Sequence, residues 1–233
     1  MLTLPEQLLL LALDDRKGTS HIYSFGSANY GLYGALLMEL AVRDRLERRD
    51  KDLVVTDATP AGDAGLDEAL RVMAQPGKPR DPAGWATELA QRMPRLEEQL
   101  LDRLVAQGLL RREQGRVLWI FPRLRYLPEN DAPEQALRAQ LRAVLLDGAA
   151  PEPRTAALIQ LVDVTGLVNT LFPHAERKAV RARIEELKVD PALSTAIGEK
   201  LRQIYDDTTA AMVMMMTAAS ADGDGGGGDG GSD

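Results

Sequence analysis

Cysteine is absent from this chain of 233 residues, and histidine occurs only twice. Without cysteine the protein can form no disulfide, no thiolate zinc site and no cysteine nucleophile, and it suits a reducing compartment such as the cytoplasm. The two histidines, His21 and His174, lie far apart in the sequence, and neither has the spacing of a metal-ligand pair. We therefore expect no metal site and no cofactor.

Long apolar runs are also absent. The longest, residues 8–13 and 210–216, fall far short of the roughly 20 residues that a membrane-spanning helix needs. The first leucines follow Pro5 and Glu6 rather than a basic segment, which indicates a capped helix and not a secretory signal. We expect no segment that spans a bilayer.

The patterns typical of enzymes are missing too. Asp14–Asp15 and Asp206–Asp207 are neighbouring acids, and neighbours on a helix do not face each other as an acid/base pair must. The glycine-rich run Gly223–Gly231 follows no predicted strand and precedes no helix, so it is no phosphate-binding loop. We expect a binding protein without catalytic residues.

Negative charge is in excess, with a formal net charge of −7. Four of the aspartates lie in the tail Asp222–Asp233, which otherwise holds only glycine and serine, and without them the net charge would be −3. Such a tail cannot bury enough apolar surface to fold. We predict one domain over residues 1–220 and a disordered tail over residues 221–233.

Positive charge gathers in one short segment of this acidic chain. Between Leu109 and Tyr126 there is one acid, Glu113, and five arginines, Arg111, Arg112, Arg116, Arg123 and Arg125. A local excess of this kind is suited to an anionic surface.

Helical spacing dominates the remaining sequence. Thr3 and Glu6 have the spacing of a capping box, and Pro5 suits a first helical turn. Apolar residues recur three and four positions apart in the segments that follow. The predicted helices cover residues 4–15, 31–45, 66–74, 85–92, 96–107, 133–147, 153–165, 176–186 and 192–219. The fold class is therefore predicted to be mainly α, in a single helical domain.

Residues 40–55 and 104–119 share one plan: a helix end, a short strand, a polar turn and a returning apolar strand. The predicted turns are residues 49–52 and 113–115, and the returning strands are residues 53–56 and 116–121. A helix followed by a hairpin is the winged-helix arrangement. We predict two winged-helix-like hairpins around a central, long C-terminal helix.

The opening stretch resembles a known family. Residues 2–18, LTLPEQLLLLALDDRKG, and residues 31–46, GLYGALLMELAVRDRL, are similar to the start of the lipid-binding domain of the Golgi phosphoprotein 3 family, and the likeness runs to about Ala219. The resemblance implies a helical, non-enzymatic adaptor that binds phosphatidylinositol 4-phosphate on the cytosolic leaflet of the Golgi and sorts membrane-protein cargo. Much Ala, Arg and Gly with little Lys favours a GC-rich bacterial source instead, with another anionic lipid.

The resemblance also implies a head-group pocket made of a loop tryptophan, an arginine in a Gly-Leu-Arg-Gly turn, and two arginines three apart on a later helix. The tryptophan position falls at or beside Ser24, the turn arginine at Tyr33, and the paired arginines at Pro94 and Glu97. The nearest residues of suitable chemistry form the predicted head-group site: Tyr23, Phe25, Tyr33, Arg92 and Arg95. The alternative is that the three aromatic residues pack a loop onto the core.

A second predicted membrane contact is the apolar run Val117, Leu118, Trp119 and Ile120, which aligns with residues that the family inserts into the membrane interface. A half-buried strand would alternate instead of running apolar. Trp119 and Tyr126 suit the lipid interface, and Arg111, Arg112 and Arg116 would face lipid phosphates. The alternative is a buried return strand with a solvated arginine edge.

A winged-helix nucleic-acid-binding protein is the competing function. Its recognition helix should present basic or amide side chains to base edges, whereas residues 96–107 contain Glu97, Glu98 and Asp102. The acidic remainder of the chain also opposes it. We therefore expect an anionic membrane lipid as partner and no nucleic acid, and the oligomeric state stays open.

Overall fold

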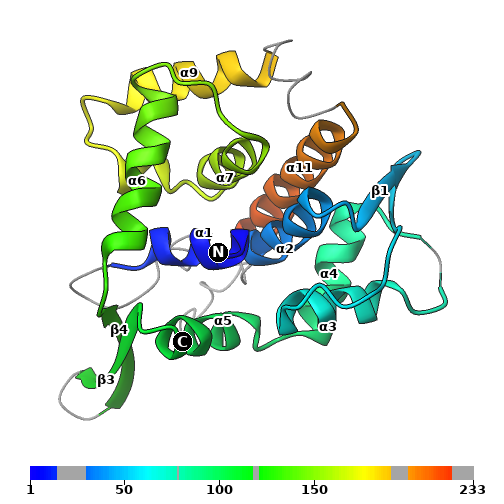
Figure 1. Ribbon diagram of the computed structural model, residues 1–233, viewed down its shortest axis with the longest axis horizontal. Coiled ribbons are helices and arrows are strands. Elements are labelled where there is room, and N and C mark those ends of the chain that lie inside the picture. Colours follow the sequence, from blue (N-terminus) through cyan, green and yellow to red (C-terminus); the bar gives the residue numbers. More distant parts are fainter. Residues whose placement is uncertain (15–29, 78, 118–120, 190–198, 222–233) are drawn as a thin grey trace, which may run out of the picture.

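The computed structural model (Figure 1) describes residues 1–14, 30–77, 79–117, 121–189 and 199–221. Helices make up most of it, with two small antiparallel sheets of two strands each. The elements are α1 (Leu4–Ala12), α2 (Tyr30–Val42), β1 (Leu46–Arg49), β2 (Asp52–Val55), α3 (Ala64–Met73), α4 (Pro82–Arg92), α5 (Leu96–Ala106), β3 (Leu110–Val117), β4 (Phe121–Pro128), α6 (Ala132–Leu145), α7 (Pro153–Val164), α8 (Val168–Leu171), α9 (Arg177–Val189) and α11 (Glu199–Ala221).

The mainly α prediction is confirmed, and the predicted helices are present with shifts of a few residues at their ends, except that residues 192–198 of the last one lie outside the described residues. The four-residue helix α8 was not predicted. The tail after residue 221 lies outside the described residues, so the proposed division into a domain and a tail stays a prediction. Within the described ranges, no helix is both long enough and apolar enough to cross a bilayer.

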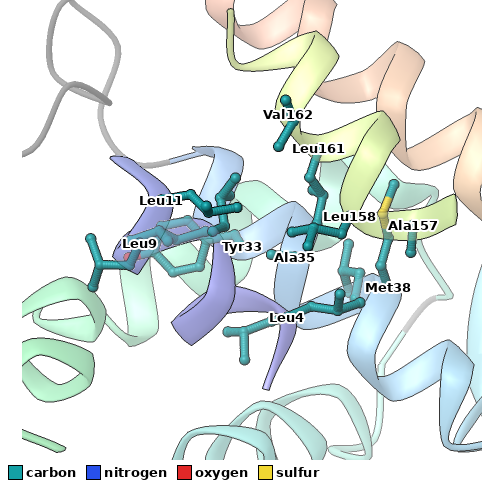
Figure 2. Close-up of a cluster of buried hydrophobic side chains, with 14 of the residues drawn as sticks. Leu4, Leu9, Leu11, Tyr33, Ala35, Met38, Ala157, Leu158, Leu161 and Val162 are labelled. Atoms are coloured by element: carbon teal, nitrogen blue, oxygen red, sulfur yellow. The ribbon is translucent and has the colours of Figure 1, made fainter. Parts of the chain in front are cut away.

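Helix α1 begins with the predicted capping box. The Glu6 carboxylate accepts hydrogen bonds from the Thr3 backbone N–H at 2.7 Å and from the Thr3 hydroxyl at 2.9 Å. Every residue of α1 is buried, because α2, α5, α6 and α7 surround it. Figure 2 shows Leu4, Leu9 and Leu11 of α1 among side chains of α2 and α7.

Helix α2 is the buried centre of the domain and packs against α1, α4, α7 and α11. Two glycines make this close packing possible. A Cβ atom added to Gly34 would lie 2.0 Å from the Met212 sulfur of α11, and one added to Gly31 would lie 2.8 Å from Thr165 Cγ2. The long helix α11 therefore rests directly on the α2 backbone.

A buried carboxylate joins three of these helices. Glu39 of α2 has no exposed surface, and its oxygens accept hydrogen bonds from the Leu4 backbone N–H at 2.7 Å and from the Arg154 guanidinium of α7 at 2.7 Å. Arg43, one turn along α2, donates to the same carboxylate at 2.7 Å. The charge of Glu39 is thus fully paired, as a buried charge requires.

Both hairpins follow a helix, as predicted, but the turn of the second one was misplaced. Leu110 pairs with Pro128 and Val117 with Phe121, so the polar residues 113–115 lie within β3 and the strands join through residues 118–120. In the first hairpin, Arg49 pairs with Asp52, which leaves a two-residue connection in which Asp50 has a φ of 55°. Asn and Asp are the side chains that tolerate this left-handed conformation best after glycine.

Candidate functional site

A cavity of about 680 Å³ opens where α4 ends and α5 begins, beside the first turn of α3. Its lining combines apolar side chains with charges of both signs. The lining residues are Ala64, Gly65, Glu68, Arg92, Met93, Pro94, Arg95, Leu96, Gln99, Leu100, Asp102 and Arg103. Two residues predicted for the head-group site, Arg92 and Arg95, therefore lie in one cavity.

These two arginines are held loosely. Arg92 donates from Nε to Glu88 at 3.1 Å, and Arg95 donates to both oxygens of Glu98 at 2.7 and 2.8 Å. Their side chains are 58% and 71% exposed. Exposed ion pairs of this kind contribute little to stability, so an incoming anion could displace either carboxylate. The hydrogen bond from Arg95 lowers the pKa of Glu98, which keeps that carboxylate charged at neutral pH.

The start of α5 adds a positive end to the same cavity. The cap position is Arg95, which makes no side-chain capping hydrogen bond, and the first helical residue, Leu96, lines the cavity. In contrast, Asp63 caps α3 by accepting hydrogen bonds from Gly65 and Leu66, both at 3.0 Å. A helix start attracts anions through its N–H groups. Here the Leu96 N–H donates to the Met93 carbonyl oxygen at 3.1 Å, and the first turn holds two acids, Glu97 and Glu98, so the two arginines are the main positive groups of the cavity.

Arg103 is a third guanidinium of the cavity, and sequence reasoning missed it. It pairs with the Asp63 carboxylate at 2.5 Å and with Glu6 of α1 at 3.3 Å, and both acids are buried. The three residues come from separate parts of the chain, so no local pattern could have connected them. The Arg103 guanidinium is paired with these two acids, so it stabilises the cavity wall and is not offered to a ligand.

Tyr33 has a different place from the one predicted. It is 3% exposed, and its hydroxyl donates to the Met93 carbonyl oxygen at 2.7 Å. Burial, together with the nearby Tyr30 and Glu97, raises its pKa to about 12. A buried phenol held in this way is not offered to a head group, so the prediction is corrected: Tyr33 supports the cavity-lining Met93 from within the core. Tyr23 and Phe25 lie outside the described residues.

The described part of the second hairpin has less free positive charge than its sequence indicates. Arg111 pairs with Glu113 and Glu129, and Arg112 pairs with Asp102 of α5. The Arg112 guanidinium also lies over the Tyr126 ring, 5.8 Å from its centroid. Tyr126 is 8% exposed, and burial raises its pKa, so the prediction that it lies at the lipid interface is wrong.

Of the predicted insertion residues, Val117 is the last residue of β3, and Leu118, Trp119 and Ile120 lie outside the described residues. The side chain of Arg116 also lies outside the described part. These five assignments stay predictions.

The acids of the chain form no metal-binding group in the described residues, and those of the cavity are paired with arginines. In the described part of the chain, no group of three His, Asp or Glu side chains could hold a metal ion. The cavity contains two carboxylates, Glu68 and Asp102, and each is paired with an arginine, Arg71 and Arg112 respectively.

Comparison with known proteins agrees with the resemblance noted in the sequence. The model of the family Golgi phosphoprotein 3 (GPP34) matches residues 4–208. Vacuolar protein sorting-associated protein 74 of Eremothecium gossypii is 33% identical over 135 residues, which are 48% of this chain and 40% of that relative. The predicted bacterial source is not tested by this match and stays a prediction. Because the family match covers most of the chain, the protein belongs to the Golgi phosphoprotein 3 family.

Proposed function

We propose that the protein is a non-enzymatic, peripheral membrane adaptor that binds the phosphorylated head group of an anionic lipid in the α4–α5 cavity. The observation that supports this most is that Arg92 and Arg95 line one opening, where α4 ends and α5 begins. Guanidinium groups bind phosphate oxygens through two donors at once.

The family resemblance favours phosphatidylinositol 4-phosphate as the lipid. In this chain the residue at the turn position of the family arginine is Tyr33, which is buried, and Arg92 and Arg95 lie beside the family's paired-arginine positions rather than on them. The positive charge is therefore concentrated at the α4–α5 connection. A head group with one exposed phosphate suits such a site, and other anionic lipids must be compared directly.

The second hairpin supplies the other half of the proposed attachment. Residues 118–120 follow Val117, the last residue of β3, and precede β4, and the two paired strands have eight residues each. Burying a leucine, a tryptophan and an isoleucine in the interface would contribute several kcal/mol, at roughly 25 cal/mol per Å² of apolar surface. Arginines near an anionic surface contribute only about 1 kcal/mol each and are screened by salt. Insertion would thus hold the protein after charge has attracted it.

The proposed location is the cytosolic leaflet of a membrane, with a membrane-protein cargo as second partner. The family name, Golgi phosphoprotein 3, and the name of the relative, a vacuolar protein sorting-associated protein, support this proposal. The competing function, nucleic-acid binding, is opposed by the net charge of −7 and by the acids Glu97, Glu98 and Asp102 on α5, the helix that would have to contact base edges.

Co-sedimentation with vesicles tests the proposal. We expect binding to phosphatidylcholine vesicles that contain phosphatidylinositol 4-phosphate or another anionic lipid, no binding to pure phosphatidylcholine, and no binding to duplex DNA. Changing Arg92 and Arg95 together to Ala should reduce lipid binding at least about tenfold, because charge-assisted hydrogen bonds are lost.

A matched control is Arg49→Ala, since Arg49 is also exposed, at 68%, and also paired with an acid, Glu47, but lies on the first hairpin. This variant should bind as the intact protein does. Equal binding by the double variant and the intact protein, or tighter binding to DNA than to any vesicle, would refute the proposed function.

A further inference from the structure

Three positive charges gather on the first turn of α9: Arg177, Lys178 and Arg181. Arg177 donates to the backbone oxygens of Phe172 at 2.9 Å and Asn169 at 2.7 Å, and Arg181 donates to the Asn169 side-chain oxygen at 3.1 Å. These acceptors are neutral. For Lys178, which is exposed, the described part of the chain shows neither a hydrogen bond nor an ion pair. We call these three residues the α9 cation cluster.

Acids near the cluster are already engaged. Glu176, which precedes Arg177, accepts both donors of Arg142 of α6 at 2.7 and 3.0 Å. Farther along α9, Arg183 pairs with Glu186 at 3.0 Å, and Lys188 pairs with Asp163 and Glu185. Cations of α9 therefore have carboxylate partners in the later turns, whereas those of the first turn have none among the described residues.

Repulsion between the positive charges of the α9 cation cluster opposes helix formation. Arg177 and Arg181 are four residues apart on one helix face, a spacing at which like charges destabilise a helix. The first turn is also the end of a helix where cations are least favourable. The hydrogen bonds of Arg177 and Arg181 hold the chain between α8 and α9, but Lys178 has no such role in the described structure. The positive charges of the α9 cation cluster have no carboxylate partner among the described residues, so they are suited to binding an anionic group of another molecule.

The cluster lies at the far end of α6 from the second hairpin. Strand β4 leads into the start of α6, and Arg142, in the last turn of that helix, contacts Glu176 beside α9. Figure 1 shows the hairpin and α9 at opposite ends of α6. The 14 residues of α6 extend about 21 Å at 1.5 Å per residue, more than twice the screening length of roughly 8 Å in physiological salt. A membrane that meets the hairpin would therefore not neutralise the cluster.

We propose that the α9 cation cluster binds an acidic peptide segment of a partner protein. Three cations within five residues match a few carboxylates of an extended chain, whose residues are spaced about 3.3–3.6 Å apart. Binding of nucleic acid usually needs more phosphate contacts, and the net charge of −7 opposes it. The inference does not depend on lipid binding, since it concerns a different face of the molecule.

Fluorescence anisotropy of a labelled decapeptide of alternating Glu and Gly tests the proposal, with a decapeptide of alternating Gln and Gly as the neutral probe. The intact protein should bind the acidic peptide in low salt and should not bind the neutral peptide. Lys178→Glu and Arg181→Glu should each weaken binding by about fivefold or more, because rim charges steer and select charged partners. The differences should shrink in about 0.5 M salt.

Lys51→Glu is the matched control. Lys51 is exposed, lacks a carboxylate partner among the described residues and lies on the connection of the first hairpin. Because Lys51→Glu is the same kind of substitution as Lys178→Glu, both variants change the net charge equally. It should bind the acidic probe within about twofold of the intact protein, as expected for a distant, screened charge.

Circular dichroism should show that all three variants are folded. If Arg181→Glu is instead unstable, the comparison of Lys178→Glu with Lys51→Glu tests the proposal. Equal losses in Lys51→Glu and Lys178→Glu would overturn the proposal, as would no binding of the acidic probe by the intact protein. It would also be overturned if Lys178→Glu lost binding to anionic vesicles or duplex DNA while its binding to the acidic peptide stayed unchanged.

Discussion

At the scale of single residues, the buried charge of Glu39 has the clearest expected effect. Removing one partner of a buried ion pair costs roughly 3–5 kcal/mol, because the other charge is left without compensation. Glu39→Gln leaves Arg154 of α7 facing a neutral amide and weakens the contact to the Leu4 N–H. We expect a loss of that size in the free energy of unfolding, measured in urea.

Glu186→Gln is the control, since Glu186 is 65% exposed in its pair with Arg183. Its effect should stay within about 0.5 kcal/mol, as for most surface substitutions. A loss below about 1 kcal/mol in Glu39→Gln, no more than a typical single hydrogen bond contributes, would show that the three helices do not depend on this carboxylate.

Tyr33 gives a prediction about pH. Its pKa is about 12 in the folded protein, against about 10 in an unfolded chain. Because the folded pKa is the higher one, the stabilisation by the neutral phenol is fully present below pH 10 and is lost as the pH rises through 12. Tyr33→Phe should cost about 1 kcal/mol near neutral pH, through the lost hydrogen bond to Met93.

Above pH 10 the stability of the intact protein should fall faster than that of Tyr33→Phe, so the two unfolding free energies converge. Chemical unfolding at several alkaline pH values measures this. Parallel pH curves would contradict the buried position of the phenol. Tyr33→Phe should also bind vesicles normally, since the structure gives Tyr33 a supporting role and not a contact with the lipid.

At the scale of elements, the packing of α2 on α11 depends on a glycine. Gly34→Ala would place a methyl group 2.0 Å from the present position of the Met212 sulfur, and Met212 is fully buried. Overpacking of this kind typically costs about 1–3 kcal/mol. The melting temperature should fall in Gly34→Ala.

Met212→Ala alone should also destabilise, by leaving a cavity. Combined with Gly34→Ala, however, it makes room for the added methyl group, so the double variant should be more stable than the sum of the single effects predicts. If the stability losses of the two single variants simply add in the double variant, the two helices do not depend on the contact between Gly34 and Met212 but contact each other elsewhere.

The elements themselves could largely be predicted from the sequence, because their signals are local. The capping box of Thr3 and Glu6 fixed the start of α1, and regular apolar spacing located the other long helices. The second hairpin was harder. Residues 113–115 are polar and resemble a turn, yet they continue β3, because an antiparallel ladder of two strands can expose polar residues.

At the scale of the whole molecule, the candidate site could be predicted only in part. Arg92 and Arg95 were found through the family resemblance, whereas Arg103 joins α5 to the buried acids Asp63 and Glu6, which lie far away in the sequence. The burial of Tyr33 also depends on how α2 packs near the α4–α5 connection. Such tertiary contacts leave no periodic signal in the sequence.

The proposed division of the chain predicts that its tail is dispensable. Residues 222–233 contain glycine, serine and four aspartates, and they offer almost no apolar surface to a core. A variant that ends at Ala221 should keep its melting temperature within about 2 °C, less than the shift that 1 kcal/mol produces in a chain of this size. It should also keep its vesicle binding. A large loss of either would show that the tail packs against the domain.

Membrane attachment through the second hairpin is the central claim, and the binding of Trp119→Ala to anionic vesicles tests it most directly. In moderate salt this variant should lose nearly all binding while its circular dichroism and melting temperature stay unchanged, whereas Arg111→Ala with Arg116→Ala should weaken binding mainly in low salt. The opposite result, in which Trp119→Ala unfolds the domain and binding by the intact protein disappears in high salt, would show that the hairpin belongs to the core and that attachment is electrostatic.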